Sequence, residues 1–204
     1  MLRRTPIVFL AWFAAVASGC AGFFPRTDPP SFYVLSASHD VATGPPLDVA
    51  VGVGPIELPA YLDRPQFVTR KGPNQLDLAE NERWASPLQK AATNALLLNL
   101  ARQLGTDRVS SFPFALGLPR DYDASVQFLR FEASASGEVF VDAYWWILDP
   151  KTGTPLAAKL SSLSRSAAAG DAAAAAAALS SALSDLSTEM AAAIREIHAR
   201  RASG

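Results

Sequence analysis

The sequence predicts a single α+β domain, with one mostly antiparallel or mixed sheet and two main helices packed on it. Three observations lead to this fold class: short strand-like runs, turns rich in Gly and Pro between them, and two long stretches with helical spacing. Each helical stretch follows a group of strands, which is the order of an α+β domain. With 204 residues, 50% of them hydrophobic, the chain can bury one sizeable core.

The first 19 residues have the features of a lipoprotein signal peptide. Arg3 and Arg4 precede an apolar run of about ten residues, which is too short to span a bilayer. Small residues then lead to Cys20, the only cysteine of the chain. The arrangement resembles a bacterial lipobox, so we expect residues 1–19 to be removed and Cys20 to carry acyl chains such as palmitate. The alternative is an ordinary signal peptide that is cut nearby, with Cys20 incidental.

Residues 20–30 are predicted to form a lipidated tether, because they are rich in Pro and lack periodicity. The folded domain then covers residues 31–204. Ala21 follows the cysteine, at the position where, by resemblance to enterobacterial sorting, Asp would retain a lipoprotein at the inner membrane. We therefore expect a protein that is anchored by lipid in the outer membrane, on its periplasmic face.

The first two strands are expected at residues 31–35 and 47–58. Aromatic and β-branched side chains indicate the first of them. In the second, alternate valines form one face, whereas Ala50, Gly52 and Gly54 form a face of small residues on which something packs closely. The glycine pair is no phosphate loop, because the third glycine of a dinucleotide fingerprint is missing and no helix follows.

The second strand is expected to break at Pro59, and a turn follows in which Asp63 and Arg64 precede Pro65. The chain then returns as a hairpin, whose strands cover residues 66–70 and 75–78.

The first helix is predicted over residues 87–104, with Ser86 as N-cap, Gln89 as its reciprocal partner and Gly105 closing the last turn. Three consecutive leucines, residues 96–98, cover roughly 200° of the helix surface. More than one neighbour must then bury this helix. These neighbours are the sheet and the second helix, or a subunit interface in addition.

Residues 106–123 are predicted to be irregular, with a short strand near residues 109–112. Their apolar side chains are either tucked under the core or exposed as a contact patch: Phe112, Phe114, Leu116 and Leu118. Asp121 and Asp123 have no His or third acid beside them in the sequence. We therefore expect solvated turn residues there and no acid–base pair.

The next strand pair is predicted at residues 125–135 and 138–149. The second of these strands is apolar on both faces, so we expect it to be central and covered twice. Trp145 and Trp146 point to opposite sides, and we expect one in the core and the other against a second layer or an interface. A last and more polar strand, at residues 156–164, is expected nearer an edge of the sheet.

The final helix is predicted from Asp171, a good N-cap, to about Arg200. Its apolar residues recur at spacings of three and four along one seam: Leu179, Leu183, Leu186, Met190, Ile194 and Ile197. Packing of this seam on the sheet is the expected use, and a short coiled coil is the alternative.

Composition and motifs argue against several function classes. A net charge of −1 means that the chain lacks the excess of basic residues that is typical of nucleic-acid-binding domains. A single Cys and two His rule out a disulfide framework and make a metal centre built on these residues unexpected. The sequence has no Gly-x-Ser-x-Gly nucleophile elbow. We therefore expect no enzyme, no catalytic residues, no cofactor and no metal.

Two motifs carry a family resemblance. The run from Val51 to Gln66 is Val-Gly-Val-Gly-Pro-Ile-Glu-Leu-Pro-Ala-Tyr-Leu-Asp-Arg-Pro-Gln, and Arg83-Trp84-Ala85-x-Pro87-Leu88 follows it. Both resemble the PqiC family of outer-membrane lipoproteins, which is the ABC-type transport auxiliary lipoprotein domain. The lipobox, the opening strand and the Leu-seamed final helix also lie where that family has them.

The resemblance implies a non-enzymatic subunit of an MCE/ABC-type intermembrane lipid transport system, which docks or receives that system in the periplasm and supports envelope integrity. Its partners would be an MCE-domain periplasmic protein and inner-membrane transport components, and the resemblance suggests self-association into a homo-oligomeric ring. The alternative function is a periplasmic ligand-binding or envelope-assembly lipoprotein unrelated to MCE transport.

If the resemblance to this family holds for function, we predict that the turn after the second strand faces a partner. The residues concerned are Tyr61, Leu62, Asp63, Arg64 and Pro65. The alternative is that Asp63 and Arg64 only lock the turn. Trp84 is expected to be a core anchor at the start of the first helix.

Overall fold

The computed structural model describes residues 29–38 and 44–203, so the predicted signal peptide and Cys20 lie outside the described residues. The predicted fold class is confirmed, because the described chain forms one α+β domain with two long helices and an eight-stranded mixed sheet. The elements in chain order are β1 (Ser31–Tyr33), β2 (Val51–Glu57), η1 (Ala60–Leu62), β3 (Gln66–Gly72), β4 (Gln75–Trp84), α2 (Leu88–Leu104), β5 (Val109–Ser111), β6 (Tyr122–Ser134), β7 (Glu138–Leu148), β8 (Pro155–Ser166) and α3 (Ala172–Ala202).

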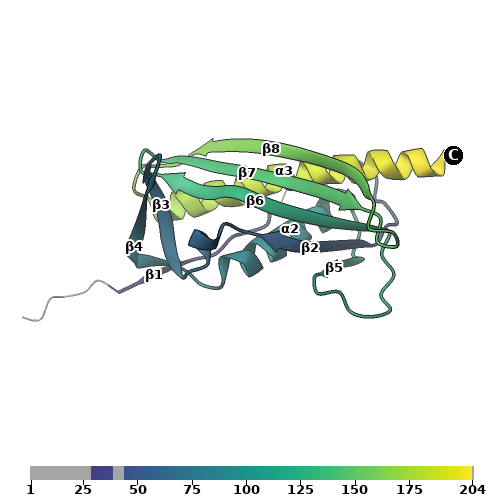
Figure 1. Ribbon diagram of the computed structural model, residues 1–204, viewed down its shortest axis with the longest axis horizontal. Coiled ribbons are helices and arrows are strands. Elements are labelled where there is room, and N and C mark those ends of the chain that lie inside the picture. Colours follow the sequence, from purple (N-terminus) through teal and green to yellow (C-terminus); the bar gives the residue numbers. More distant parts are fainter. Residues whose placement is uncertain (1–28, 39–43, 204) are drawn as a thin grey trace, which may run out of the picture.

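Strand β6 is the centre of the sheet (Figure 1). Its first half pairs in parallel with β2, and its last residues pair in parallel with β3. Its other edge pairs antiparallel with β7, which in turn pairs with β8. Because β2 and β3 share one edge of β6, η1 and the turn that connect them lie beside the middle of that strand.

The predicted hairpin is confirmed, since β3 and β4 pair antiparallel. Strand β4 runs six residues further than the sequence pattern indicated, to Trp84 instead of Leu78. Its end is held from both sides, because Arg83 lies opposite Gln66 of β3 and also opposite Phe32 of β1. Pairing between distant parts of the chain therefore extends a strand that local propensity would end.

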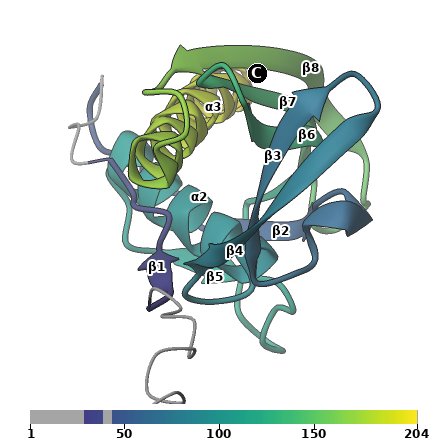
Figure 2. The same ribbon diagram turned by 90° about the vertical axis from the view of Figure 1, so that its left-hand side faces the viewer.

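Both helices lie inside the curve of the sheet (Figure 2). Helix α3 packs on β6, β7 and β8, and α2 packs on β2, β5 and α3. The predicted seam of α3 is confirmed as core, because each of its members is at most 5% exposed: Leu179, Leu183, Leu186, Met190, Ile194 and Ile197. Asp171 caps the helix as predicted, and its Oδ1 accepts a hydrogen bond from the Ala174 N–H at 2.9 Å.

Only one face of β7 is covered within the described chain, so the second layer expected on the other face is absent, whereas the alternative of an interface there stays a prediction. Val141, Ala143 and Trp145 face the helices and are at most 3% exposed. Tyr144, on the other face, is 36% exposed. The strand is central in the hydrogen-bonding direction, between β6 and β8, but both helices lie on the same side of it. Among the described strands, the more polar last strand, β8, pairs with β7 alone and is an edge strand as expected.

The predicted capping box at the start of α2 is also wrong. The helix begins at Leu88, and Pro87 occupies the cap position without a side-chain hydrogen bond. The Gln89 amide instead donates to the carbonyl oxygen of Ile56 in β2, so a contact between two elements replaces the local cap. At the other end Gly105 closes the helix as predicted, with φ 67° in the left-handed region. Leu96 is fully buried, whereas Leu98 is 46% exposed.

Candidate docking surface

The two sequence motifs meet around the start of α2. Pro65 follows the turn after η1, and its carbonyl oxygen accepts a hydrogen bond from the Trp84 N–H at 2.8 Å. The bond from Gln89 to Ile56 ties the first turn of α2 to the end of β2. Segments that are 19 and 33 residues apart in the chain are thereby held side by side.

Two shallow hollows flank Asp63 on this surface. One, of about 360 Å³, lies between the turn and the residues before α2, with Arg64, Pro65 and Ser86 among its walls. The other, of about 320 Å³, lies between η1 and the first turn of α2. Asp63 lines both hollows and so forms the ridge between them. We define the docking surface as Asp63, Arg64, Pro65, Ser86 and Pro87.

The inner side of the turn is fixed in the protein. Leu62 is 3% exposed and belongs to the core. Tyr61 is half-buried, and burial together with the neighbouring Glu132 carboxylate raises the pKa of Tyr61 to about 12. Glu132 is itself buried and pairs with Arg70 of β3. Two of the five turn residues predicted to face a partner thus have much of their side chain directed inward.

The outer side of the turn has polar groups without partners. Within residues 29–38 and 44–203, the Asp63 side chain makes no hydrogen bond or ion pair, and it is exposed. The Arg64 Nε is buried and likewise has no hydrogen-bond partner among the described residues. The turn is held by backbone bonds instead, from the Leu62 N–H to Pro59 and from the Asp63 N–H to Ala60. The hydrogen bonds of this turn are thus made by the backbone, and a partner-facing role of Asp63 and Arg64 stays a prediction.

Trp84 lies under the docking surface as a core anchor, as expected. It is 6% exposed and stacks on Phe67, with ring centroids 4.9 Å apart and planes at 26°. Phe67 meets Tyr33 of β1 edge-on at 6.0 Å. This aromatic cluster fixes the base from which Ser86 and Pro87 project.

Asp121 is solvated as expected, with its side chain 52% exposed, whereas Asp123 lies in β6 and is mostly buried, which corrects the expectation for that residue. The Asp121 Oδ2 accepts a hydrogen bond from the Ala50 N–H at 2.7 Å. Asp123 pairs with Arg120 at 2.7 Å, and its side chain is 13% exposed. Both carboxylates have partners in the protein, so they hold the segment before β6 in place. The contact of Asp121 with Ala50 joins residues 71 positions apart, which no local pattern indicates. Arg120, by contrast, is only three residues from Asp123, so that pair was a local signal that sequence reasoning did not use.

A larger hollow lies elsewhere, between the segment after β1 and the first turns of α3. It measures about 590 Å³ and is lined by Phe32, Val34 and a row of Ala and Ser side chains of α3. Across the described ranges, His, Cys, Asp and Glu side chains form no group of three that could hold a metal ion. Neither described helix is long and apolar enough to cross a membrane.

Comparison with known proteins places the chain among transport components. The family model described as "ABC-type transport auxiliary lipoprotein component" matches residues 33–191. This match confirms the resemblance drawn from the two motifs, and the family is one of transport auxiliary components, not of enzymes. The matched range begins after Cys20 and so does not include it. No curated protein matches the chain.

Solved structures share the fold at low sequence identity. Protein XCC0632 from Xanthomonas campestris, of the family DUF330, superposes with a TM-score of 0.71 at 18% identity, over 85% of this chain and 99% of that one. The crystal structure of an uncharacterized protein gives 0.67 at 22% identity, over 82% and 99% of the two chains. A PelC dodecamer from Paraburkholderia phytofirmans gives only 0.39 at 15% identity, over 74% and 94%. The first two likenesses show the fold alone.

Proposed function

We propose that this chain, which belongs to the ABC-type transport auxiliary lipoprotein family, is the outer-membrane subunit of an MCE/ABC-type intermembrane lipid transport system. It docks or receives the periplasmic MCE-domain protein of that system, while inner-membrane components drive transport. The protein has no catalytic role, and its contribution to envelope integrity comes from binding.

The observation that carries this proposal is the docking surface at the start of α2. Both family motifs converge there, although the core needs only part of them: Leu62 and Trp84 are buried, whereas Asp63 and Pro65 are exposed. An exposed carboxylate without an intramolecular partner, between two hollows, suits a basic or hydrogen-bond-donating group of a partner protein. Arg64 lies beside it and lines one of the two hollows.

A pull-down from detergent-solubilised envelopes tests this proposal. The bait is tagged full-length protein, and both proteins and lipids are identified by mass spectrometry. We expect an MCE-domain protein with the wild type and several-fold less of it with Asp63→Ala or Arg64→Ala. The matched control replaces Glu196 and Arg200 of α3 by Ala, an exposed acid–base pair with side chains 73% and 65% exposed.

The other outcomes favour other functions. Equal recovery with the turn variants and the control would mean that Asp63 and Arg64 do not contact the partner. Lipid without an MCE-domain protein would favour a ligand-binding lipoprotein, and recovery of neither would favour an envelope-assembly role.

The lipid anchor forms the second part of the proposal. Acylation of Cys20 holds the protein at the outer membrane, and Cys20→Ser is expected to abolish acylation and release the chain from the membrane. Ala21→Asp is expected to move the protein to the inner-membrane fraction in a density gradient. An unchanged distribution of both variants would contradict the anchor and its sorting signal.

Self-association into a ring is the third part. Two features could support contacts between copies: the exposed side chains on the outer face of β7, and the edge of β8 that faces away from β7. Mass measurement of the detergent-solubilised, lipidated protein tests it, and a monomer at micromolar concentration would contradict it.

A further inference from the structure

An uncharged loop projects from the domain between β5 and β6. Residues 111–119 read Ser-Phe-Pro-Phe-Ala-Leu-Gly-Leu-Pro, and we call them the apolar loop. Phe112 and Leu118 are each 52% exposed, and Leu116 is 103% exposed. Of the two alternatives that the sequence left open, the structure therefore selects exposure for these three side chains. Large apolar side chains gathered at one protruding site mark a contact with an apolar surface.

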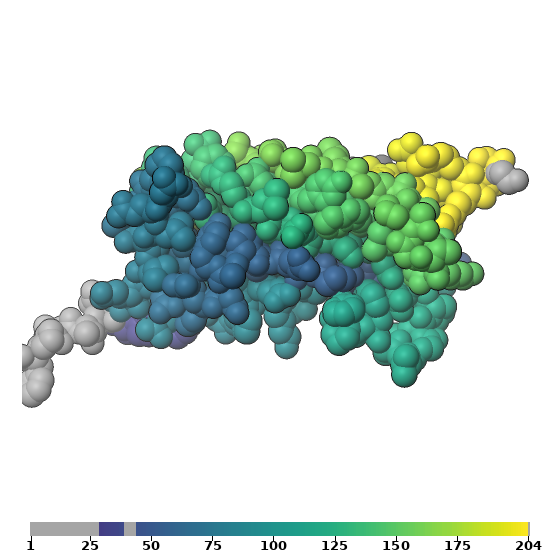
Figure 3. All heavy atoms as spheres, viewed as in Figure 1, coloured from purple at the N-terminus to yellow at the C-terminus, as the bar shows by residue number. Residues whose placement is uncertain are grey.

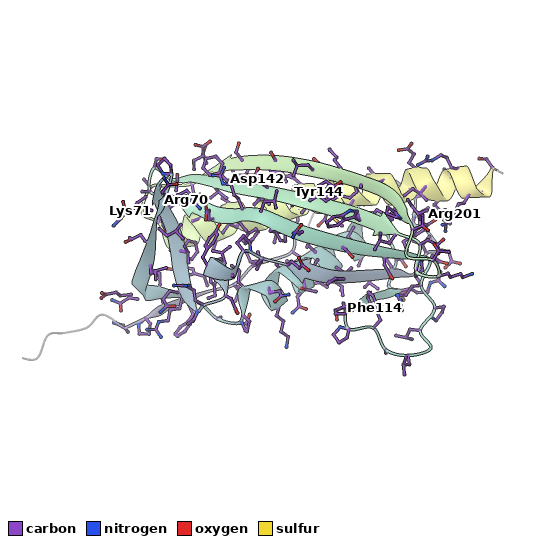
Figure 4. All side chains as sticks on the ribbon, in the orientation of Figure 1. Arg70, Lys71, Phe114, Asp142, Tyr144 and Arg201 are labelled. Atoms are coloured by element: carbon purple, nitrogen blue, oxygen red, sulfur yellow. The ribbon has the colours of Figure 1, made fainter. Side chains whose placement is uncertain are left out.

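The root of the apolar loop is packed tightly against β2. Gly52 has no side chain, and a Cβ there would lie 2.7 Å from the ring of Phe114. This is the close packing that the face of small residues predicted. The Arg120 guanidinium, which is paired with Asp123, lies 4.0 Å from the centre of the Phe114 ring. Figure 4 shows Phe114 at this root. The Phe112 N–H donates to a β2 carbonyl at 2.9 Å.

This root leaves only the tip free to make a contact. Gly117, with φ 82°, turns the chain there between Leu116 and Leu118. The arginines near the root, Arg108 and Arg120, are both paired with aspartates. The loop therefore offers apolar side chains without a basic patch around them.

The apolar loop lies on the same side of the domain as the start of the described chain. In Figures 1 and 2, both β1 and the loop lie below the sheet, and Figure 3 shows the loop protruding there at the end of the molecule away from β1. The residues between Cys20 and Pro29 can span at most about 30 Å, because an extended residue advances by about 3.3–3.6 Å. A bilayer that holds Cys20 thus passes close to this side.

We propose that the tip of the apolar loop, Leu116 and Leu118, inserts into the leaflet of the bilayer that carries the lipid anchor. The anchor and the loop then make two separate attachments, which orient the domain on the membrane. A lipid surface fits better than a protein partner because the tip is convex, uncharged and turned to the anchored side. Insertion depends on apolar area, so neutral phospholipid suffices. This inference rests on the proposed acylation of Cys20.

A fluorophore at the loop tip tests the insertion. In the lipidated protein Cys20 is acylated, so Leu116→Cys introduces the one free thiol, which is labelled with an environment-sensitive dye. The full-length lipidated protein is reconstituted in phosphatidylcholine vesicles, with or without brominated acyl chains. We expect a blue shift of the emission and quenching by the brominated lipid. The matched control is Ser162→Cys, an exposed position on β8, for which we expect neither effect.

Two other results overturn the proposal. If the dye at position 116 emits as in water and is not quenched, the loop does not enter the bilayer. If its emission shifts only after an MCE-domain protein is added, the loop contacts protein and not lipid. The vesicles contain no partner, so this test is independent of the docking proposal. Mapping of the dye by mass spectrometry shows whether Cys20 was left free, which would identify a failure of the anchor instead.

Discussion

The two faces of β7 carry similarly apolar side chains but have opposite surroundings. Towards α3, Trp145 is 3% exposed, and its ring N–H donates to Ser161 at 3.0 Å. On the outer face Tyr144 is 36% exposed and meets Trp146 edge-on, with centroids 4.5 Å apart. The difference shows that a run of apolar residues predicts a strand but does not predict whether one or both of its faces are covered. The placement of the helices decides that.

The outer face is not apolar along its whole length (Figure 4). At the end near β3, Glu132 pairs with Arg70, and Arg130 lies 3.8 Å from the same carboxylate. Arg130 also reaches Asp142 at 3.4 Å and covers the ring of Phe140 at 4.0 Å. One face of the strands is therefore held by apolar packing, and one end of the other face by a cluster of charges.

The largest expected effect comes from breaking this cluster. Arg70→Met removes the main partner of Glu132, whose side chain is 0% exposed and whose Oε2 has no hydrogen-bond partner among the described residues. A buried carboxylate left without its partner typically costs about 3–5 kcal/mol of unfolding free energy. Denaturant unfolding measures this loss.

The matched control removes both charges. Arg70→Met combined with Glu132→Leu is expected to regain most of the stability, because a buried pair can be replaced by apolar groups at little cost. If the single variant loses less than about 1 kcal/mol, the charges do not hold this end of the outer face.

Truncation on the inner face should be nearly as costly. Met190 is 0% exposed in the middle of the α3 seam. Met190→Ala is expected to lower the unfolding free energy by about 2–5 kcal/mol, because it removes buried methylene groups and leaves a cavity. The control is Leu98→Ala on α2, where the side chain is 46% exposed and a change near 0.5 kcal/mol is typical. If both variants lose the same unfolding free energy, the burial of Met190 does not determine how much its side chain stabilises the protein.

The charged end of the outer face should also give the unfolding free energy a pH dependence, through Tyr61 beside Glu132. The pKa of Tyr61 is raised to about 12 by burial and by Glu132, whereas an unfolded Tyr ionises near pH 10. The unfolded chain thus loses its proton first, and the stability that Tyr61 contributes is present below about pH 10 and lost as the pH rises towards 12. Tyr61→Phe is expected to flatten the decline in unfolding free energy between these values. Parallel curves for the two proteins would rule out this contribution.

The sequence predicted a structural feature correctly where the local pattern and the tertiary structure favour the same conformation. The seam of α3, its cap at Asp171 and the closing Gly105 follow from spacing and from backbone preference, and the structure contains all three. The capping box of α2 failed because Gln89 reaches a strand that lies 33 residues earlier in the chain. Capping patterns consider neighbouring residues only, so they cannot predict that Gln89 will bond to a distant strand instead of completing the cap.

The candidate site was predictable in position but not in orientation. The turn after β2 lies at the surface where the motifs placed it, yet Leu62 is buried and Tyr61 turns towards Glu132. The partner of Tyr61 is on β6, and the register that brings the two together depends on the pairing of distant strands. From the sequence alone, Glu132 was one polar residue in a strand, with no sign of its burial.

The smallest expected effect lies on the apolar part of the outer face. Leu160 of β8 is 54% exposed and lies opposite Tyr144 in the strand register. Leu160→Ala is expected to change the unfolding free energy of the dilute protein by less than about 0.5 kcal/mol, because little area leaves or enters water. A loss above 1 kcal/mol at every concentration would mean that this face is covered within one chain. A loss that grows with protein concentration would mean that another copy covers it, since association stabilises by mass action.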